Sequence, residues 1–594
     1  MPAAKKIVII GGVAGGASAA ARCRRLDEFA EILLLQSGPD VSFASCGMPY
    51  YIGGEIKDRA KLAVQTPASL RARLAIDVRV NVRVDAIDTA AKTVSARDER
   101  TGDTFDASYD DLVIAVGAAP FKPPVPGIDT RPGLFALRNL DDMDAITAWM
   151  LARIAAAGGD ASAVHAVVAG AGFVGLEMVE QLMRRGLRVT LVEMLPQILA
   201  PIDEEMAAIL QADLEKRGVR VITGDAIAEF RVAPGADPDA TDVVLKSGLQ
   251  LPAAQLTILG LGVRPDTAVV QAAGIACTPR GHVIVDDQLR TSVPGVWAVG
   301  DAIEVRNPAL PGADERWAVP LAGPANRQGR MVADNIYGKA RAYKGTWGAS
   351  VVRCFDLTVA CVGVTEKTLR ARGLPYAAVH VHPGSHAGYY PGAAFINFKL
   401  LFDPARGRVY GAQSVGADGV EKRIDVIATA MQGGLTVEDL AELELCYAPP
   451  VGSAKDPVNL AGMAAQNVMD GLVTQLDWRD LAAAAADADT AVIDVRGAGE
   501  IAAAGALTEG AINIPLDDLR ARIGEVPRGK RLVVSCASGQ RAYYACRVLA
   551  QRGFARVDNL GGAYKTYAVM AARERAAAAA AAAATAPTAN GDHK

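Results

Sequence analysis

The chain has 594 residues, of which 51% are hydrophobic and 22% are charged. At roughly 100–200 residues per domain it can form about three to five domains, and this composition excludes an intrinsically disordered protein. The 62 basic and 66 acidic residues give a net charge of −4, which provides no electrostatic reason to expect a nucleic-acid or anionic-membrane partner.

The eight cysteines are scattered and form no CxxC pair, a pattern that is typical of a reducing cytosol. The apolar run that follows Lys5 and Lys6 is short and leads into a glycine-rich turn and an arginine-containing helix. This order favours a strand-turn-helix over a signal peptide. No apolar stretch is long enough for a transmembrane span. We therefore expect a cytoplasmic protein.

The first 150 residues alternate strand-like apolar runs with helical segments, which predicts a parallel α/β sheet. The first run, KIVII, leads into the glycine loop 11–16 and then into a helix, so the loop backbone can approach a pyrophosphate closely. The loop departs from the dinucleotide-binding pattern twice. Val13 stands where the middle glycine belongs, and Gln36 stands where an acidic residue is expected.

A distant segment strengthens this first dinucleotide site. The apolar run GVWAVGD ends at Gly300 and Asp301, and in flavoproteins with two dinucleotide sites such an aspartate binds the ribityl chain of FAD. We therefore predict an FAD site. Its predicted glycine-loop residues are Gly11, Gly12, Ala14, Gly15 and Gly16.

The segment SFASCGMPYY follows the second strand of this pattern and contains Cys46. Disulfide reductases with an internal dithiol have a second cysteine five positions further on, where this chain has Tyr51. A single thiol must pair with an exogenous thiol or cycle through a sulfenate or persulfide. The alternative is an inert buried cysteine, because sequence does not show the environment that activates a thiol.

Residues 160–270 repeat the α/β pattern and contain a more regular glycine loop. Gly170, Gly172 and Gly175 follow an apolar strand and open a helix, and Glu193 ends the next strand. An acidic residue there accepts hydrogen bonds from a ribose 2′-hydroxyl and repels a 2′-phosphate. The pattern therefore predicts a site for NADH, with NADPH as the alternative.

The pattern changes twice in the second half of the chain. From about 345 to 465 strands and helices follow each other in an α+β order, and a new α/β pattern begins near Asp477. The segment HVHPGSH places His380, His382 and His386 close together, but no acidic or cysteine partner lies nearby in sequence. We favour polar strand positions near a dimer interface over a metal site and expect no metal. We expect the alanine-rich segment 576–594 to be a disordered tail.

The motifs of residues 1 to about 465 resemble the single-cysteine branch of the pyridine nucleotide-disulfide oxidoreductases, most closely the coenzyme A-disulfide reductases. The similar stretches include SFASCGMPYYIGG, TSVPGVWAVGD, LAGPANRQGR, HAGYYPGA and CYAPPVGSAKDPVN. The resemblance implies a homodimer in which Cys46 faces the flavin, and in which Tyr389 and Tyr447 reach the site from the partner subunit. It also implies that Gly117 and Ala322 lie at the flavin.

The same resemblance implies coenzyme A as substrate or bound ligand. The residues that would hold its phosphates and arm are Arg22, Arg25, Ser42, Ser45 and Arg73. Arginine suits phosphate because its planar fork forms two hydrogen bonds to the oxygens. Ser45 replaces the asparagine that is usual in the family, which weakens one of these contacts. Related NADH peroxidases and oxidases have a histidine in the first glycine loop where this chain has Ala14, and this difference disfavours peroxide chemistry.

Residues from about 476 to 575 resemble a rhodanese domain, with VIDVR, GAINIP and the loop from Cys536 to Arg541. The backbone N–H groups of such a loop stabilise a thiolate or persulfide. Protein tyrosine phosphatases have a similar loop that is one residue longer, so this loop suits a sulfane sulfur better than a phosphate. A binding module that has lost its activity is the alternative.

These interpretations together predict an α/β protein with two Rossmann-like domains, an α+β dimerisation domain and a C-terminal rhodanese domain. The expected boundaries are 1–150 and 271–340 for the FAD-binding domain, 151–270 for the NAD(P)H-binding domain, 341–467 for dimerisation, and 476–575 for the rhodanese domain.

The expected function is NAD(P)H-dependent reduction of coenzyme A persulfide, polysulfide or disulfide through Cys46. The rhodanese cysteine would handle sulfane sulfur, and the two tyrosines would donate a proton or a hydrogen bond to the leaving sulfur. Two alternatives stay open. One is a plain coenzyme A-disulfide reductase with an accessory rhodanese domain. The other is a sulfur carrier or redox sensor whose flavin half only reports redox state.

Overall fold

The computed structural model describes residues 4–233, 237, 239–312 and 315–585. The chain forms two compact units, which are described separately. The first unit contains the chain up to Pro196 together with Gly218–Thr346, and the second contains Gln197–Arg217 and the chain from Trp347 on. Within the described residues, no helix combines the length and the apolar character that crossing a membrane requires.

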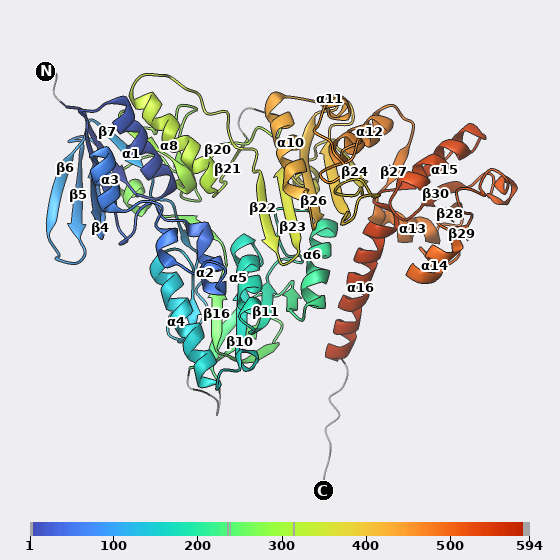
Figure 1. Ribbon diagram of the computed structural model, residues 1–594, viewed down its shortest axis with the longest axis horizontal. Helices are drawn as coiled ribbons and strands as arrows, with labels where there is room; N and C mark the ends of the chain where they lie inside the picture. Colours follow the sequence, from blue (N-terminus) through green and yellow to red (C-terminus); the bar gives the residue numbers. More distant parts are fainter. Residues whose placement is uncertain (1–3, 234–236, 238, 313–314, 586–594) are drawn as a thin grey trace, which may run out of the picture. The chain divides into compact units, whose positions relative to one another are not determined.

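The first unit begins with a five-stranded parallel sheet in the order β19-β7-β1-β2-β3 (Figure 1). Its central strands are short apolar runs with both faces covered, as parallel sheets require. Helices α1 (Ala14–Leu26) and α8 (Ala322–Ile336) pack against each other beside it. The strands are β1 (Lys6–Ile10), β2 (Glu31–Gln36), β3 (Asp77–Val80), β7 (Asp111–Ile114) and β19 (Val296–Ala298).

A second parallel sheet in the order β12-β11-β10-β16-β9 repeats this architecture. Helix α5 (Phe173–Arg184) follows β10 and packs on it, as α1 follows β1. Strand β9 precedes residue 151, so this sheet begins earlier in the chain than the expected boundary. The strands are β9 (Leu134–Phe135), β10 (His165–Ala169), β11 (Arg188–Glu193), β12 (Arg220–Thr223) and β16 (Leu256–Leu259).

Smaller elements complete the first unit. Two three-stranded antiparallel sheets are β4 (Val82–Asp88) with β5 (Thr93–Asp98) and β6 (Thr104–Ser108), and β13 (Ile227–Val232) with β14 (Thr241–Leu245) and β15 (Gln250–Ala254). Strands β8 (Ala118–Pro120) and β17 (Val263–Pro265) pair, as do β18 (Val283–Ile284), β20 (Ile303–Arg306) and β21 (Arg316–Trp317). The remaining helices are α2 (Met48–Gly53), α3 (Pro67–Leu74), α4 (Leu140–Ala156) and α7 (Ala268–Ala272).

The second unit contains an antiparallel domain built on the sheet β22-β23-β26-β25-β24. Helix α6 (Glu204–Lys216) belongs to this unit, although it lies in sequence between two strands of the second parallel sheet. The strands are β22 (Ser350–Cys354), β23 (Leu357–Gly363), β24 (Ala377–Val381), β25 (Ile396–Phe402) and β26 (Val409–Gly416). The helices are α9 (Glu366–Ala371), α10 (Val420–Gly433), α11 (Val437–Glu442) and α12 (Pro457–Met469).

The C-terminal domain of the second unit is a parallel sheet in the order β27-β31-β30-β28-β29 with helices on it. Its strands are β27 (Thr474–Leu476), β28 (Thr490–Asp494), β29 (Ile512–Asn513), β30 (Arg531–Ser535) and β31 (Val557–Leu560). Its helices are α13 (Leu481–Ala486), α14 (Ala498–Ala504), α15 (Gln540–Gln551) and α16 (Ala563–Thr585). The predicted fold class is confirmed by these sheets.

The end of the chain differs from the prediction. The segment 576–594 is expected to be disordered, but α16 continues through Thr585. Alanine has the highest helix propensity of all residues, so a run of alanines can continue an existing helix. Residues 586–594 lie outside the described part of the chain.

Candidate functional site

The two glycine loops agree in backbone geometry at their first and last glycines despite their different sequences. Gly11 and Gly170 both have a φ of +97°, which favours glycine. A Cβ on Gly16 would lie 1.8 Å from the Gly11 carbonyl oxygen, and one on Gly175 would lie 2.0 Å from that of Gly170. The first and last glycines therefore close both turns, which is why the first loop tolerates Val13 at its middle position.

The residue at the end of the second strand contacts the loop in the same way in both sheets. Gln36 Oε1 accepts a hydrogen bond from Gly12 N at 2.8 Å, and Glu193 Oε2 accepts one from Ala171 N at 2.8 Å. Glu193 Oε1 also accepts from Leu195 N at 2.8 Å. An amide oxygen thus replaces the carboxylate in the first loop and makes the same contact without a charge.

A hollow of about 850 Å³ opens beside the first glycine loop. Gln36 and Asp301 are among its lining residues, and burial raises the pKa of Asp301. Seven of the predicted flavin contacts line it: Gly11, Ala14, Gly15, Gly117, Gly300, Asp301 and Ala322. Gly12 and Gly16 do not line the hollow. Gly12 faces Leu34 and Val41 instead, and Gly16 faces the Gly11 carbonyl.

The fit of this hollow to FAD rests on the chemistry of its lining. Gly11 and Gly15 let the loop backbone line the hollow, where its N–H groups can approach a pyrophosphate, with Val13 and Ala14 as the loop side chains beside it. The carboxyl of Asp301 can accept hydrogen bonds from the hydroxyls of a ribityl chain. These residues fit the flavin that the sequence predicts.

Cys46 lies in the 3₁₀ turn Ser45–Gly47 directly before α2. Its side chain is exposed, and it lines the 850 Å³ hollow as well as a second one of about 670 Å³. Ser45 and Phe43 also line both hollows. The thiol therefore stands where the two hollows meet, within reach of molecules bound in either of them.

The second hollow carries exposed arginines from three helices. Arg25 on α1, Arg73 on α3 and Arg330 on α8 line it, and the predicted contacts Ser42 and Ser45 line it as well. Sequence reasoning missed Arg330, whose helix lies far from the others in sequence. It also missed the polar lining residues Ser18, Gln65, Ser69 and Asn326.

Arg22, a further predicted contact, is absent from the lining of this hollow. Its guanidinium lies 2.7 Å from the buried carboxylate of Asp334 and joins α1 to α8. Because this ion pair already occupies its guanidinium, we leave Arg22 out of the proposed substrate site.

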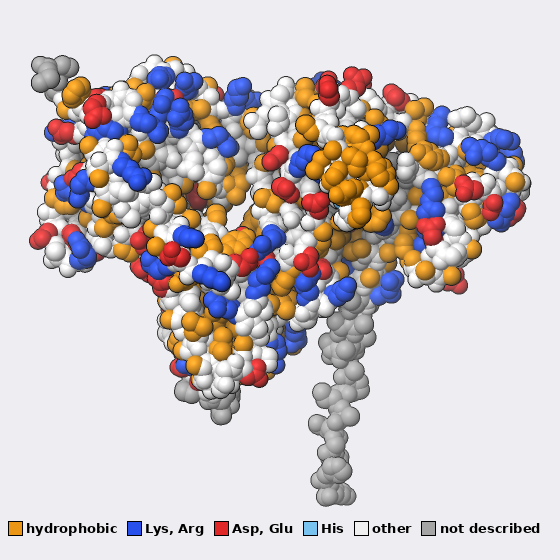
Figure 2. All heavy atoms as spheres, viewed as in Figure 1, with side chains coloured by type: hydrophobic (Ala, Val, Ile, Leu, Met, Phe, Trp, Pro, Cys, Tyr) orange, Lys and Arg blue, Asp and Glu red, His pale blue; other side chains and the backbone are white. Residues whose placement is uncertain are grey.

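The two predicted tyrosines lie together in the second unit, in loops of the antiparallel domain. Their hydroxyl oxygens are 2.9 Å apart, and Tyr389 and Tyr447 are 76% and 47% exposed. The hydrogen bond to Tyr447 raises the pKa of Tyr389. Figure 2 shows hydrophobic side chains gathered over the region where Figure 1 labels α12 and β24. Such a patch is typical of a protein–protein contact.

The C-terminal domain holds the second predicted reactive cysteine at the end of β30. Cys536 Sγ accepts a hydrogen bond from Gly539 N at 3.1 Å, and the residue is fully buried beneath its loop. Arg541, in the first turn of α15, forms two hydrogen bonds of 2.7 Å to Glu500. These bonds lower the pKa of Glu500 to about 2. One loop N–H thus donates to the sulfur, and the guanidinium of Arg541 is already paired with a carboxylate.

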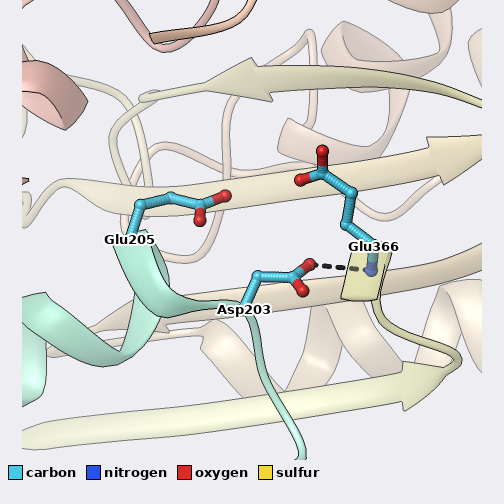
Figure 3. Close-up of side chains that lie close together, drawn as sticks. All are labelled: Asp203, Glu205 and Glu366. Atoms are coloured by element: carbon cyan, nitrogen blue, oxygen red, sulfur yellow. Dashed lines mark hydrogen bonds between the residues drawn. The ribbon is translucent and has the colours of Figure 1, made fainter. Parts of the chain in front are cut away.

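A group of buried carboxylates was not predicted from sequence. Asp203, Glu205 and Glu366 point toward a common centre in the second unit (Figure 3). Three carboxylates in this arrangement would suit a divalent cation. However, Lys399 Nζ lies 3.0 Å from Asp203 and 2.5 Å from each of the two glutamates. The ammonium therefore takes the place of a cation.

The three histidines have separate partners. His380 Nε2 lies 3.1 Å from Glu205, His382 contacts Asn397 and Gly562, and His386 Nδ1 lies 3.2 Å from its neighbour's carbonyl. Among the described residues no group of metal-ligating side chains includes a histidine.

Comparison with protein families assigns three regions of the chain. Residues 5–329 match pyridine nucleotide-disulphide oxidoreductases, and residues 349–457 match the dimerisation domain of the same enzymes. Residues 477–569 match rhodanese-like domains. The antiparallel domain is therefore the dimerisation domain of this family, and the C-terminal domain is rhodanese-like.

Individual relatives agree with this assignment. The chain is 34% identical over 467 residues to a coenzyme A disulfide reductase of Staphylococcus haemolyticus, a match that covers 78% of this chain and all of the relative. The reduced CoADR-RHD of Bacillus anthracis superposes with a TM-score of 0.90 at 44% identity, covering 96% of this chain and 99% of that one. An NAD-dependent persulfide reductase from A. fulgidus has a TM-score of 0.86 at 34% identity, covering 95% and 100%.

The family requires FAD and a nicotinamide dinucleotide, which agrees with the two glycine loops and the hollow beside the first of them. From its two glycine loops to its dimerisation domain, the chain belongs to the pyridine nucleotide-disulfide oxidoreductases, a family of flavoenzymes, and it carries a rhodanese-like domain in addition.

Proposed function

We propose that this protein uses NADH to reduce coenzyme A persulfide, polysulfide or coenzyme A disulfide through Cys46. The observation that carries the proposal is the place of this thiol, which lines both the flavin-type hollow and the arginine-bearing hollow. Electrons can enter from one side and a sulfur substrate from the other. The names of the Staphylococcus and A. fulgidus relatives support this class of substrate.

Coenzyme A fits the second hollow by its charge. Three exposed guanidinium groups line this hollow, those of Arg25, Arg73 and Arg330. A guanidinium can form two parallel hydrogen bonds to the oxygens of a phosphate, and coenzyme A carries several phosphates. Ser42 and Ser45 lie closer to the thiol in sequence and would hydrogen-bond the pantetheine arm. The hollow of about 670 Å³ has the size of ordinary ligand pockets.

The dinucleotide contacts follow from the two loops. In the first loop the backbone N–H groups and Asp301 would hold FAD, which supplies two-electron transfer from the nicotinamide when bound. In the second loop Gly170, Gly172 and Gly175 would hold the NADH pyrophosphate. The carboxylate of Glu193 beside the loop favours a ribose hydroxyl over a 2′-phosphate, so we propose NADH over NADPH.

The sulfur chemistry balances with one protein thiol. The Cys46 thiolate attacks the outer sulfur of coenzyme A persulfide, which breaks the S–S bond, releases the coenzyme A thiolate and leaves a Cys46 persulfide. Two electrons then split this persulfide into the Cys46 thiolate and hydrosulfide. With coenzyme A disulfide the same attack gives a mixed disulfide, and two electrons release the second coenzyme A thiolate.

The remaining predicted residues serve the same sulfur substrates. Cys536 would accept or supply sulfane sulfur as a persulfide that the N–H groups of its loop stabilise. In a homodimer built on the dimerisation domain, Tyr389 and Tyr447 would donate a proton or a hydrogen bond to the leaving sulfur at the partner's site. Their exposed hydroxyls and the hydrophobic surface of that domain support this arrangement.

The test is anaerobic NADH oxidation with coenzyme A persulfide and, in parallel, coenzyme A disulfide, with release of hydrosulfide measured. Cys46→Ser should abolish turnover of both, and Cys277→Ser, which changes a partly exposed cysteine that lines neither hollow, should not. Faster turnover of the persulfide supports a sulfur-reducing enzyme. Preference for the disulfide makes thiol reduction the main activity, with the rhodanese domain accessory.

Two results would overturn parts of the proposal. If neither substrate is turned over with NADH, the chain is a sulfur carrier or redox sensor instead. If Cys536→Ser leaves the turnover of every sulfane substrate unchanged, the coupling between the two cysteines is wrong.

A further inference from the structure

The loop of Cys536 is held from outside by residues 561–565, which are the turn before α16 and the first residues of that helix. Tyr564 N donates to the Cys536 carbonyl at 3.0 Å, and Lys565 N donates to the Ala537 carbonyl at 3.1 Å. These bonds fix the direction of two loop carbonyls, and on the same loop the N–H of Gly539 donates to the sulfur. The orientation of the loop therefore depends on the turn at residues 561–565.

This turn has an uncommon backbone conformation. Gly562 has a φ of +73° and Ala563 a φ of +52°, so two consecutive residues are left-handed. The left-handed conformation is unfavourable for alanine because its Cβ crowds the following carbonyl oxygen, and Ala563 is fully buried. Such a conformation persists only where the surroundings fix it.

The residues that fix the turn come from the dimerisation domain. His382 follows β24, and its Nε2 lies 3.1 Å from the Gly562 carbonyl oxygen. The other ring nitrogen, Nδ1, lies 2.8 Å from the side-chain oxygen Oδ1 of Asn397 on β25. The Lys565 ammonium lies 3.4 Å above the ring of Phe395. The turn is thus held between the rhodanese loop and the dimerisation sheet.

The protonation of His382 agrees with a donor role. Burial lowers its pKa to about 4, so the ring is neutral near pH 7 and carries one N–H. The Gly562 carbonyl oxygen and Asn397 Oδ1 both accept hydrogen bonds, and a neutral ring can donate to only one of them. We assign the proton to Nε2, which faces Gly562; in that tautomer Nδ1 accepts, and the Asn397 side chain has to turn its amide nitrogen toward the ring. The Gly562 carbonyl also accepts from Thr566 N at 3.3 Å, so two donors fix its direction.

We propose that His382 of the dimerisation domain is a positioning residue for the sulfur site of the rhodanese domain. By holding the Gly562 carbonyl it sets the turn whose N–H groups orient the Cys536 loop. This inference rests on the proposed sulfur-transfer role of Cys536. It means that the rhodanese site reaches its full activity only when it is docked on the dimerisation domain of the same chain.

The experiment compares three variants of the full-length holoenzyme. His382→Leu fills the space but donates nothing, His382→Gln restores an N–H near the place of Nε2, and Thr566→Val is the matched control. The Thr566 hydroxyl lies 3.4 Å from the same ring nitrogen, and its loss leaves the bond to Gly562 in place. Sulfur transfer is measured with thiosulfate as donor and cyanide as acceptor. NADH-dependent reduction of coenzyme A disulfide reports on the rest of the molecule.

The leucine variant should lose between about tenfold and a hundredfold in the kcat of sulfur transfer, the effect of a small misplacement of reacting groups. The glutamine and valine variants should stay within about threefold of the wild type. Reduction of coenzyme A disulfide should not change. The rate at which iodoacetamide alkylates Cys536, followed against pH, should shift in the leucine variant alone, because a displaced loop exposes the buried thiol and no longer stabilises its thiolate.

Two failures are distinguishable. If His382→Leu retains wild-type kcat and the wild-type alkylation profile, His382 does not position the loop and the inference is overturned. If the wild-type chain transfers no sulfur, the proposed role of Cys536 fails, and the alkylation profile still tests His382. Equal losses in the leucine and glutamine variants would also overturn the inference, since the hydrogen bond would then not be the cause.

Discussion

Replacing Lys399 by methionine tests the buried charge network directly. The Lys399 ammonium is fully buried, and three carboxylates, those of Asp203, Glu205 and Glu366, lie within 3.0 Å of it. Burial alone would lower the pKa of Lys399, but these carboxylates outweigh that effect and raise it. Methionine has a similar length and no charge, so the variant leaves buried carboxylates without their central cation.

The magnitude follows from the cost of breaking a buried ion pair, about 3–5 kcal/mol when one partner is removed. Three carboxylates share this lysine, and the guanidinium of Arg479, 3.4 Å from Glu366, compensates only part of their charge. We therefore expect a loss near the upper end of that range, about 5 kcal/mol. In a unit of this size each kcal/mol lowers the Tm by about 2 °C, so the variant should melt about 10 °C lower.

Calorimetric melting of the holoenzyme measures this effect, with Lys530→Met, which removes an exposed ammonium of the rhodanese domain, as the matched control. Its Tm should stay within about 2 °C of the wild type. The pH dependence gives a second criterion. Burial raises the pKa of Glu366 in the wild type, but Lys399 outweighs burial and lowers this pKa to about 2. The ionised carboxylate therefore stabilises the folded protein above about pH 4.3, and this stabilisation is lost as the pH falls through about 2.

Without the ammonium, burial raises the pKa of the carboxyl groups above their unfolded values. The destabilisation of Lys399→Met is then greatest near pH 7 and becomes smaller as the pH falls toward about 5, where the buried groups take up protons. A variant that melts within about 2 °C of the wild type near pH 7 would refute the reasoning. So would a difference between variant and wild type that grows as the pH is lowered.

Three further predictions concern the proposed sites. Glu193→Gln removes a charge that repels the 2′-phosphate, so it should raise the ratio of kcat/KM for NADPH to kcat/KM for NADH by about tenfold or more. Glu193→Asp keeps the charge and should leave this ratio unchanged. Steady-state kinetics with both nucleotides measures the ratio. Arg330→Ala should raise the KM for coenzyme A disulfide by about tenfold, while Arg22→Lys should leave that KM unchanged. Glu500→Gln should remove a stabilisation that is present above about pH 4.3 and is lost as the pH falls through about 2. Its Tm should therefore fall below the wild-type value near pH 7 and converge with it at low pH; equal differences at all pH values would contradict the pairing with Arg541.

The dinucleotide loops could be predicted from sequence because their determinants are local. A buried apolar strand, glycines at fixed positions and the first turn of a helix lie within one short segment, and the same steric requirement recurs at Gly11 and Gly170. Cys46 could be singled out for the same reason, since its neighbours in sequence are also its neighbours in the two hollows.

Features that depend on distant segments could not be predicted. Lys399 reads as a charged interruption of an apolar strand, and only the fold brings the carboxylates of Asp203 and Glu366 to it. Arg22 and Arg330 are both arginines on helices beside the first glycine loop, but Asp334, a residue distant from Arg22 in sequence, decides which of the two faces the second hollow. The sequence pattern does not show which charged side chains will pair when they lie hundreds of residues apart.

Arg479 lies at the beginning of the rhodanese-like domain, yet its guanidinium pairs with Glu204 of α6 at 3.0 Å and with Glu366 of the dimerisation domain at 3.4 Å. Beside it Trp478 belongs to the same buried hydrophobic cluster as Ala208 of α6. The rhodanese-like domain therefore forms specific contacts with the rest of its unit. Removing it would take Arg479 away from Glu204 and Glu366, so a helix encoded far upstream of this domain relies on it for part of its charge pairing.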